Sequence, residues 1–230
     1  MTTRIYTNWE ERTESFHMKH KGETCLIISI GPNLHLTPPA LFNYPSFGIN
    51  TYYRHLEEYG PPTYWIGVDA RLFREGEQEI KKAYPDIPKF IPTPDRDDMD
   101  GENFYRFKHR SGEIYIGGQM PWYPRALTRH GIAYHRILGA VFQIAHYMGF
   151  SRMLVIGLQH KPGEESQHSW GFDSKGFQGQ NQQIWYDEYN LWARANPETE
   201  IINISEDTYV PETALKRDDW RKYAIKEKIK

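Results

Sequence analysis

The feature that most constrains the fold of this chain is a stretch of apolar or small residues, 25–30 (CLIISI), that runs directly into Gly31-Pro32-Asn33. A short apolar run that ends at Gly is typical of a buried strand in a parallel sheet. Gly31 permits another group to approach the backbone closely, and Pro32 stiffens the turn. In open α/β sheets, ligands bind beyond the carboxyl ends of the strands. The stretch therefore predicts a first strand followed by a ligand-binding loop, although a Gly-Pro pair also serves as a simple turn.

Further strands and helices are expected to alternate along the chain. The expected strands are 46–50, 63–68, 88–91, 152–158 and 200–204, and the expected helices are 52–59, 70–84, 132–148 and 181–195, with a short helix starting at Thr37. The strongest helix prediction is 132–148, because apolar residues recur at helical spacing and Gly149 follows as a C-cap. This alternation predicts a Rossmann-like α/β fold with a mostly parallel, doubly wound sheet.

Three segments depart from the alternation. Residues 103–108 and 113–116, separated by a Ser-Gly turn, predict a β-hairpin inserted at about 103–117. Residues 159–180 form a polar loop of a length typical of lids, with an ordinary surface loop as the alternative. The polar tail from 206 is expected to be a frayed or surface helix, and the polar residues 1–22 an arm or edge element. We assign all of 1–230 to a single domain.

The composition argues against several classes of protein. The formal net charge is −2 over 230 residues, so we expect no broad nucleic-acid-binding surface. No apolar run approaches the roughly 20 residues of a membrane-spanning helix, and the polar start of the chain does not resemble a signal peptide. The single cysteine, Cys25, cannot form an internal disulfide, which fits a reducing compartment. We therefore expect a cytoplasmic protein.

Polar or glycine residues follow four of the expected strands. They are Gly31-Pro32-Asn33, Asn50, Asp69 and Gln159-His160. In a parallel sheet the carboxyl ends of the strands share one edge, which is where this class of fold binds ligands. The pattern predicts that these residues converge on one site, although solvated strand ends are polar in any protein.

Two further segments carry candidate functional residues. Thr128-Arg129-His130-Gly131 precedes the longest expected helix, where backbone N–H groups and the charge of Arg129 favour a phosphate or carboxylate. Capping by Thr128 beside a solvated Arg129 explains the same residues equally well. In the loop 159–180, His168 and Asp173 are candidates for an acid-base group and the carboxylate that orients it.

Signatures of several enzyme classes are missing from the sequence. It contains no HExxH motif and no cysteine pair for a metal, no GxSxG nucleophile motif, and no GxGxxG or Walker loop. Four acidic residues between 95 and 100 lack the spacing of an EF-hand. We therefore expect no metal site, and the glycine pattern disfavours a dinucleotide or P-loop assignment.

The order of these motifs resembles a superfamily of Rossmann-like proteins. It includes bacterial lipooligosaccharide sialyltransferases, motility accessory factors and archaeal 6-hydroxymethylpterin diphosphokinases. The similar segments are GPN at 31–33, FGIN ending at Asn50, YWIGVDARLF around Asp69, the run from Thr128 to Gln159 and the final EIINIS, and together they cover roughly 24–205. In that superfamily the Gly-Pro-Ser type loop after the first strand contacts the nucleotide.

The resemblance implies a sialyltransferase-like glycosyltransferase that uses a nucleotide sugar and needs no metal. Its donor-binding residues would be Gly31, Pro32, Asn33, Asn50, Asp69, His130, Gly131 and Gln159. Arg129 and the following helix would neutralise the leaving phosphate. His168 would remove the proton of a glycan or other hydroxyl acceptor.

Two departures from the family pattern leave alternatives open. Gln159 replaces the Asp that commonly follows this strand, and the surroundings of His168 differ from those of the family base. One alternative is an ATP- and Mg-dependent diphosphokinase with Asp69 as the metal ligand. The other is a non-catalytic nucleotide-binding protein of the same fold. Apart from the nucleotide co-substrate no cofactor is implied, and the oligomeric state is left open.

Overall fold

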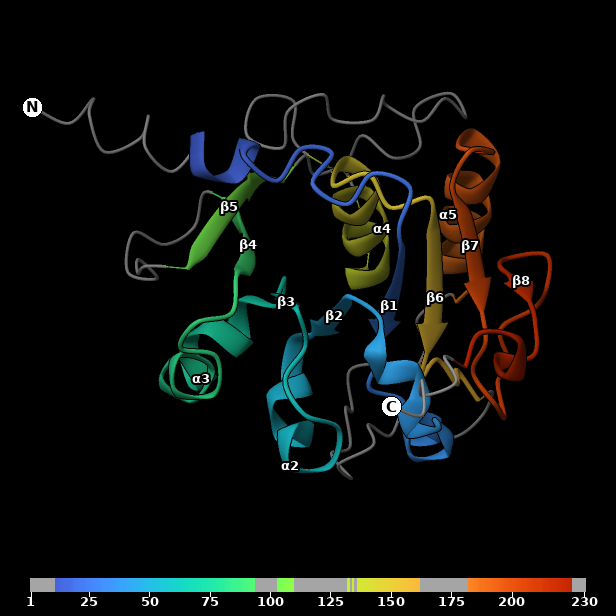
Figure 1. Cartoon of the computed structure of the whole chain (residues 1–230), viewed down its shortest axis with the longest axis horizontal. Coiled ribbons are helices and arrows are strands. Elements are labelled where there is room, and N and C mark those ends of the chain that lie inside the picture. The colour runs from blue at the N-terminus through green and yellow to red at the C-terminus, as the bar shows by residue number, and fades with distance from the viewer. Residues whose placement is uncertain are drawn as a thin grey trace, which may run out of the picture.

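The computed structural model of the protein describes residues 11–93, 103–109, 132, 134, 136–161 and 182–224. Eight strands form one sheet in the order β5-β4-β3-β2-β1-β6-β7-β8, and every pair of neighbours is parallel (Figure 1). The strands are β1 (Thr24–Ile28), β2 (Ser46–Ile49), β3 (Tyr64–Ile66), β4 (Lys89–Thr93), β5 (Phe104–Lys108), β6 (Arg152–Ile156), β7 (Glu200–Asn203) and β8 (Lys216–Arg217).

The order of the strands places a topological switch point between β1 and β6. After β1 the chain adds β2 to β5 on one side of the sheet, and then β6 to β8 on the other. Strands β1 and β6 pair over their full lengths, from Thr24↔Arg152 to Ile28↔Ile156. Such a doubly wound, parallel arrangement is the predicted Rossmann-like α/β fold, which is therefore confirmed, and the sheet is parallel throughout.

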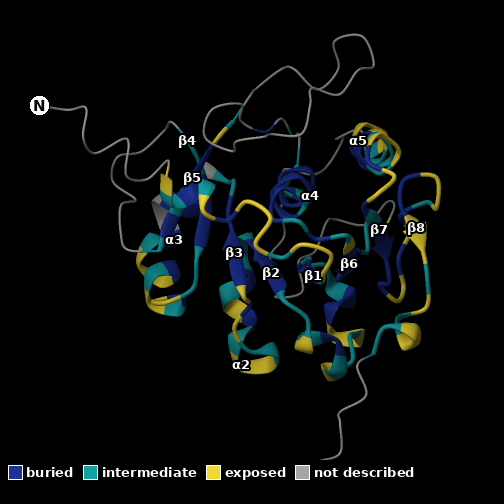
Figure 2. Ribbon diagram, turned by 45° about the horizontal axis from the view of Figure 1, so that its top comes forward, coloured by how far each residue is buried: buried dark blue, intermediate teal, exposed yellow. Residues whose placement is uncertain are grey.

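Helices and turns cover both faces of the sheet. The helices are α2 (Leu56–Tyr59), α3 (Ala70–Ala83), α4 (Ile137–Tyr147) and α5 (Gln182–Ala195), and 3-10 helices span Pro32–Leu36, Pro39–Asn43, Asn50–His55 and Trp220–Lys222. Side chains of β1 alternate between the faces, since Cys25 and Ile27 pack with α4 and α5 whereas Leu26 and Ile28 pack with the 3-10 helices. Figure 2 shows α4 and α5 on one side of the sheet and α2 and α3 on the other.

The long helix begins later than its apolar pattern predicts. Ile132, the expected first residue, instead forms a parallel bridge with His109 and donates its N–H to the carbonyl of Lys108. The side chain of Ile132 is buried against the sheet edge. A residue buried in a helix is apolar as well, so the sequence pattern could not distinguish the two. α4 starts at Ile137 and ends where Gly149 adopts a φ of +91°, as expected for a C-cap glycine.

The segment expected to begin a hairpin belongs to the main sheet. Residues 104–108 form β5, which pairs in parallel with β4 from Lys89↔Phe104 to Thr93↔Lys108. Its expected hairpin partner, 113–116, lies outside the described residues, as does the lid-like loop beyond Lys161. The hairpin and the lid therefore stay predictions.

The tail from 206 folds differently from the expected frayed or surface helix. Val210, Ala214 and Leu215 are buried in the core, and the chain continues as β8, which pairs with β7. The apolar residues are spaced irregularly among polar ones, so no periodic pattern announces this packing. Residues 11–22 are likewise no simple arm, because Phe16 is buried against Tyr64 and Phe90.

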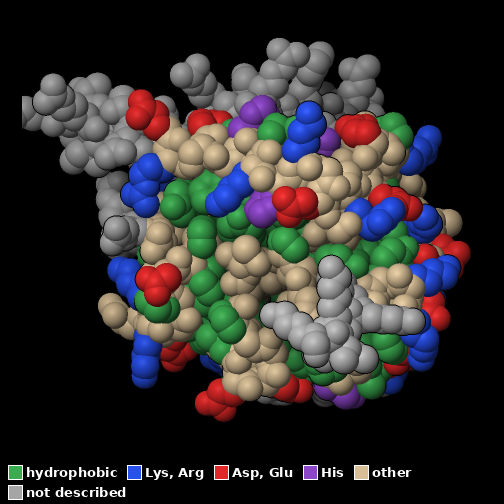
Figure 3. Space-filling view, in the orientation of Figure 1, with side chains coloured by type: hydrophobic (Ala, Val, Ile, Leu, Met, Phe, Trp, Pro, Cys, Tyr) green, Lys and Arg blue, Asp and Glu red, His purple; other side chains and the backbone are tan. Residues whose placement is uncertain are grey.

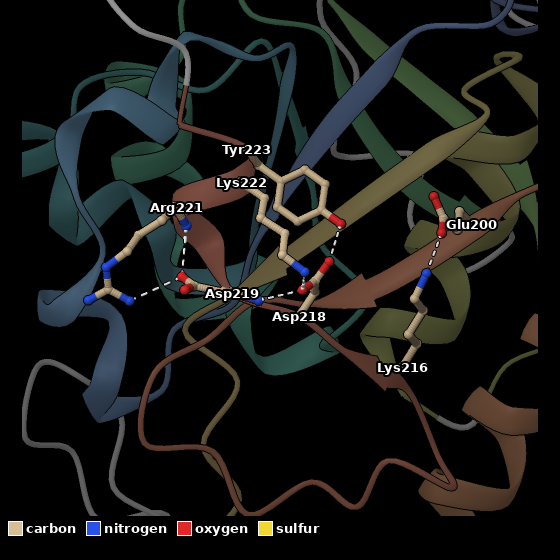
Figure 4. Close-up of polar contacts among 7 residues, drawn as sticks. All are labelled: Glu200, Lys216, Asp218, Asp219, Arg221, Lys222 and Tyr223. Atoms are coloured by element: carbon tan, nitrogen blue, oxygen red, sulfur yellow. Dashed lines mark hydrogen bonds and ion pairs between the residues drawn. The ribbon is translucent and has the colours of Figure 1, made fainter.

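A group of polar contacts joins the C-terminal segment to itself and to β7 (Figure 4). Asp218 accepts from Lys222 Nζ at 2.5 Å and from the Tyr223 hydroxyl at 2.8 Å, and Lys216 Nζ lies 2.6 Å from Glu200. Ion pairs as exposed as these contribute little to stability. We therefore attribute the fold of this segment mainly to its buried apolar side chains.

Candidate functional site

Six of the predicted site residues lie at one edge of the sheet. Asp69 follows β3, Asn50 follows β2, Gly31 to Asn33 follow β1, and Gln159 follows β6. These four strands are neighbours and run in parallel, so their carboxyl ends share an edge, as the sequence predicts. Arg129, His130, Gly131 and His168 lie outside the described residues.

The loops that follow β1 and β6 touch each other through their backbones. The N–H of Gly31 donates to the carbonyl of Gly157 at 2.8 Å, and the N–H of Ser29 donates to the carbonyl of Ile156 at 2.9 Å. A Cβ atom at Gly31 would lie 2.4 Å from the Gly157 oxygen, and one at Gly157 would lie 2.1 Å from the Ser29 oxygen. Only glycine fits at both positions, and Gly157 also has a φ of +65°. The contact fixes the position of the first loop at the switch point.

We predict that Gly157→Ala lowers the free energy of unfolding by at least about 3 kcal/mol, because a left-handed alanine and a backbone clash act together. Gly22→Ala is the matched control, since Gly22 also has a positive φ but has nothing within 4 Å of its Cβ position. That variant should lose only about 1 kcal/mol. Urea denaturation measures both, and equal losses would contradict the contact.

Asn33 is buried beside this contact. Its amide Nδ2 donates to the carbonyl of Glu206 at 2.6 Å, which ties the loop after β1 to the loop after β7. Its Oδ1 would lie 3.1 Å from a Cβ atom at Gly31, so the side chain folds back over that residue. Oδ1 is buried and has no hydrogen-bond partner. Asn33 therefore holds a buried acceptor atom near the switch point that no hydrogen bond satisfies.

Asn50 and Asp69 occupy the ends of β2 and β3. Asn50 has a left-handed φ of 44°; its carbonyl accepts from Trp65 Nε1 at 2.8 Å, and its Oδ1 accepts from the N–H of Val68 at 3.4 Å. Asn50 thus joins the two strand ends and aligns the following segment. Asp69 is half-buried and lies directly before α3.

Gln159 faces the loop after β7. Its Nε2 donates to Asp207 at 2.6 Å, and its carbonyl accepts from the N–H of Tyr209 at 2.9 Å. Next to it, the N–H of Leu158 donates to Ser205 Oγ at 3.1 Å. Gln159 therefore joins the ends of β6 and β7. Its place after a strand did not predict this structural role.

The residue at the N-terminus of α4 is Arg136 and not one of 128–131. Because α4 starts at Ile137, its N-cap is Arg136 and not Thr128. The guanidinium of Arg136 lies 4.4 Å from the ring centroid of Trp185 on α5, within the range of a cation–π contact. Arg136 thus places positive charge at this end of α4, and the role of Arg129 stays a prediction.

A glycine on α4 lets a buried carboxylate of α5 pack closely against that helix. Glu188 of α5 is fully buried, and its Oε1 lies 2.1 Å from where a Cβ atom of Gly139 on α4 would stand. Any larger residue at position 139 would displace the carboxylate. Glu188 also acts electrostatically on Arg136, so the two helices enclose opposite charges.

The sequence analysis expected His160 at this edge of the sheet but gave it no role in binding or catalysis. It follows Gln159 directly, has a left-handed φ of 55°, and packs against the rings of Trp185 at 5.4 Å and Tyr186 at 5.8 Å. Burial, aided by the positive charge of Arg136, lowers the pKa of His160 to about 4. The one signal in the sequence was a histidine immediately after a buried strand, and its surroundings depend on helices distant along the chain.

We predict that His160 makes stability depend on pH between about 4 and 6.5. The unfolded chain takes up the proton near pH 6.5 and the folded one only near pH 4, so lowering the pH through this window favours unfolding. The loss should approach about 3 kcal/mol, since one pKa unit corresponds to about 1.4 kcal/mol.

His160→Asn removes the titrating group and tolerates the left-handed backbone. Its free energy of unfolding should therefore fall less than that of the wild type between pH 7 and pH 4, as measured by urea denaturation at each pH. Parallel pH profiles for the two proteins would contradict the assignment.

The surface and the described elements add two observations. On the face viewed in Figure 3, Lys and Arg side chains are interspersed with Asp and Glu, without a broad field of one sign. Among the described residues there is no cluster of three or more His, Cys, Asp or Glu side chains able to hold a metal. Within the same part of the chain, no helix has the length and apolar character needed to cross a membrane.

Comparison with known proteins supports the fold. No protein-family model matches the sequence, and no curated protein matches it significantly. The structure is similar to that of the sialyltransferase CstII from Campylobacter jejuni in complex with a substrate analogue, cytidine-5'-monophosphate. The TM-score is 0.52 and the identity is 12%, over 84% of each chain. The chain therefore has a sialyltransferase-like Rossmann fold, which confirms that part of the resemblance at the level of fold.

Proposed function

We propose that the protein is a glycosyltransferase that moves a sugar from a nucleotide donor to a hydroxyl acceptor without a metal. The observation that carries the proposal is the row of strand ends at the switch point, where Gly31 to Asn33, Asn50 and Asp69 share one edge. Ligands of doubly wound folds bind at this position. The similar sialyltransferase structure contains cytidine-5'-monophosphate, which supports a nucleotide as the ligand class.

The loop after β1 is the element we assign to the nucleotide. Gly31 and Pro32 bring the backbone close to the ligand, and Asn33 Oδ1 accepts a hydrogen bond from one of its donors. Asn50 and Asp69 border the same edge, and Gln159 closes it on the side of β7. In this assignment Gln159 acts mainly through the loop it supports.

The transfer step itself needs a base and a counter-charge. The acceptor oxygen forms a bond to the anomeric carbon, while the bond from that carbon to the phosphate oxygen breaks and its electron pair leaves with the phosphate. In this proposal His168 removes the proton of the acceptor hydroxyl, and Arg129 stabilises the charge of the leaving phosphate. His130 and Gly131, which follow Arg129 in the sequence, contribute to donor binding. These roles rest on the family resemblance.

We predict that a cytidine-linked sugar raises the melting temperature of the protein and is consumed when a hydroxyl acceptor is supplied. Asn33→Ala should weaken nucleotide binding about tenfold, because a buried hydrogen bond to the ligand is lost. Asn43→Ala is the matched control, since Asn43 is exposed and bonds only to the carbonyl of Ala40. Thermal shift, calorimetry and donor consumption provide the measurements.

The same experiment separates the proposal from its alternatives. If no nucleotide sugar binds or turns over, the glycosyltransferase proposal is refuted. Stabilisation by ATP only with magnesium would favour the diphosphokinase, with Asp69 as the metal ligand. Tight nucleotide binding without turnover of any donor would favour a non-catalytic nucleotide-binding protein.

A further inference from the structure

The C-terminal segment 218–224 lies on the face of the sheet that carries the 3-10 helices. It follows β8, which is parallel to β7 and therefore ends at the same edge of the sheet as the candidate site. Trp220 and Tyr223 pack against the buried apolar side chains of this face, which include Leu34 from the loop after β1. The segment and the connection from β1 to β2 thus share one apolar cluster.

Hydrogen bonds join this segment to both ends of the connection from β1 to β2. Just before β2, the hydroxyl of Tyr44 donates to the carbonyl of Tyr223 at 2.7 Å. After β1 the link runs through Glu206. Trp220 Nε1 donates to Glu206 Oε1 at 2.6 Å, and the carbonyl of Glu206 accepts from Asn33 Nδ2, also at 2.6 Å. Glu206 therefore connects the C-terminal segment to the loop that we assign to the nucleotide.

The hydrogen bond between Trp220 and Glu206 is the strongest candidate for holding that loop in place. Its acceptor is a carboxylate, and hydrogen bonds to charged groups are stronger than those between neutral ones. Arg221 also approaches, with its guanidinium 4.6 Å from the Trp220 ring centroid and Nη2 3.7 Å from Glu206 Oε1, but such exposed ion pairs contribute little. The indole is fixed by its packing against the apolar cluster, so it can fix the carboxylate in turn.

We propose that Trp220 and Glu206 are positioning residues for the nucleotide donor, because they hold the loop from Gly31 to Asn33 in the position that binds it. The inference rests on the proposed glycosyltransferase activity and gives the C-terminal segment a part in donor binding. Neither side chain needs to touch the ligand. A loop that is already fixed loses less conformational entropy when the ligand binds, so loosening the loop weakens binding.

Two substitutions of the same kind distinguish this role from a general effect on stability. Trp220→Phe removes the indole donor and keeps an aromatic ring against the apolar cluster. Tyr223→Phe is the matched control, since it removes the phenol that donates to Asp218 at 2.8 Å but keeps the carbonyl to which Tyr44 donates (Figure 4). In calorimetry with cytidine-5'-monophosphate, Trp220→Phe should raise the Kd about three- to tenfold, and Tyr223→Phe should change it less than about twofold. In a transfer assay Trp220→Phe should raise the donor KM similarly, with kcat and the acceptor KM within about twofold of wild type.

A double-mutant cycle tests whether the two residues act through one contact. Glu206→Ala should weaken nucleotide binding as much as Trp220→Phe does, and the double variant should bind no more weakly than either one. Glu206→Gln keeps an oxygen acceptor for the indole and should retain most of the wild-type affinity. Should Trp220→Phe fold poorly, Glu206→Ala against Glu206→Gln makes the same comparison without changing the apolar cluster.

Each outcome decides the inference. Wild-type affinity in Trp220→Phe and Glu206→Ala, or additive losses in the double variant, would refute it while leaving the glycosyltransferase proposal intact. Equal losses of affinity in Trp220→Phe and Tyr223→Phe, following equal drops in melting temperature, would show a general effect on stability and also refute it. A wild-type protein that neither binds cytidine-5'-monophosphate nor consumes a nucleotide sugar would remove the proposed function, and the inference with it. A raised Kd that is confined to variants of the contact between Trp220 and Glu206 supports it.

Discussion

The backbone contact between Gly31 and Gly157 is the constraint on which the rest of the site depends. It joins β1 and β6 beyond their last paired residues and leaves no space there even for a methyl group. A ligand at the switch point therefore cannot enter between the loops and must lie across them. What it meets is peptide backbone together with the few side chains that the loops direct to the surface.

The polar residues along this edge divide into two groups. On the side of β7, Gln159, Ser205 and Asp207 bond to one another or to the backbone, so they hold the loops together. Near the switch point, Asn33 Oδ1 and His160 Nδ1 are buried and have no hydrogen-bond partner. A protein interior seldom tolerates such atoms unless something else satisfies them. Asn33 belongs to both groups, because its Nδ2 also ties the loop after β1 to the carbonyl of Glu206. Polarity alone could not separate the satisfied atoms from the unsatisfied ones.

The sequence predicted the central sheet well because its signals are local. The stretches 25–30 and 153–158 consist of apolar and small residues, as expected for short strands covered on both faces. The start of α4 was misplaced because Ile132 is buried through a bridge to His109, a contact between distant segments. The C-terminal segment escaped notice for a similar reason, since its buried residues follow no period. That the site residues share one edge could be predicted, because it follows from the order of parallel strands. The surroundings of His160 could not, because they are formed by residues of α4 and α5 that are distant in the sequence.

Those two helices also determine the electrostatics beside the proposed reaction centre. Arg136 and the fully buried Glu188 place opposite charges between α4 and α5, and Gly139 lets the helices come close enough to exclude water from the carboxylate. Charges act more strongly in such surroundings than in solvent. Burial lowers the pKa of His160, and Arg136 lowers it further, which keeps the imidazole neutral. The packing of two helices thus keeps a histidine at the end of a strand uncharged at pH 7.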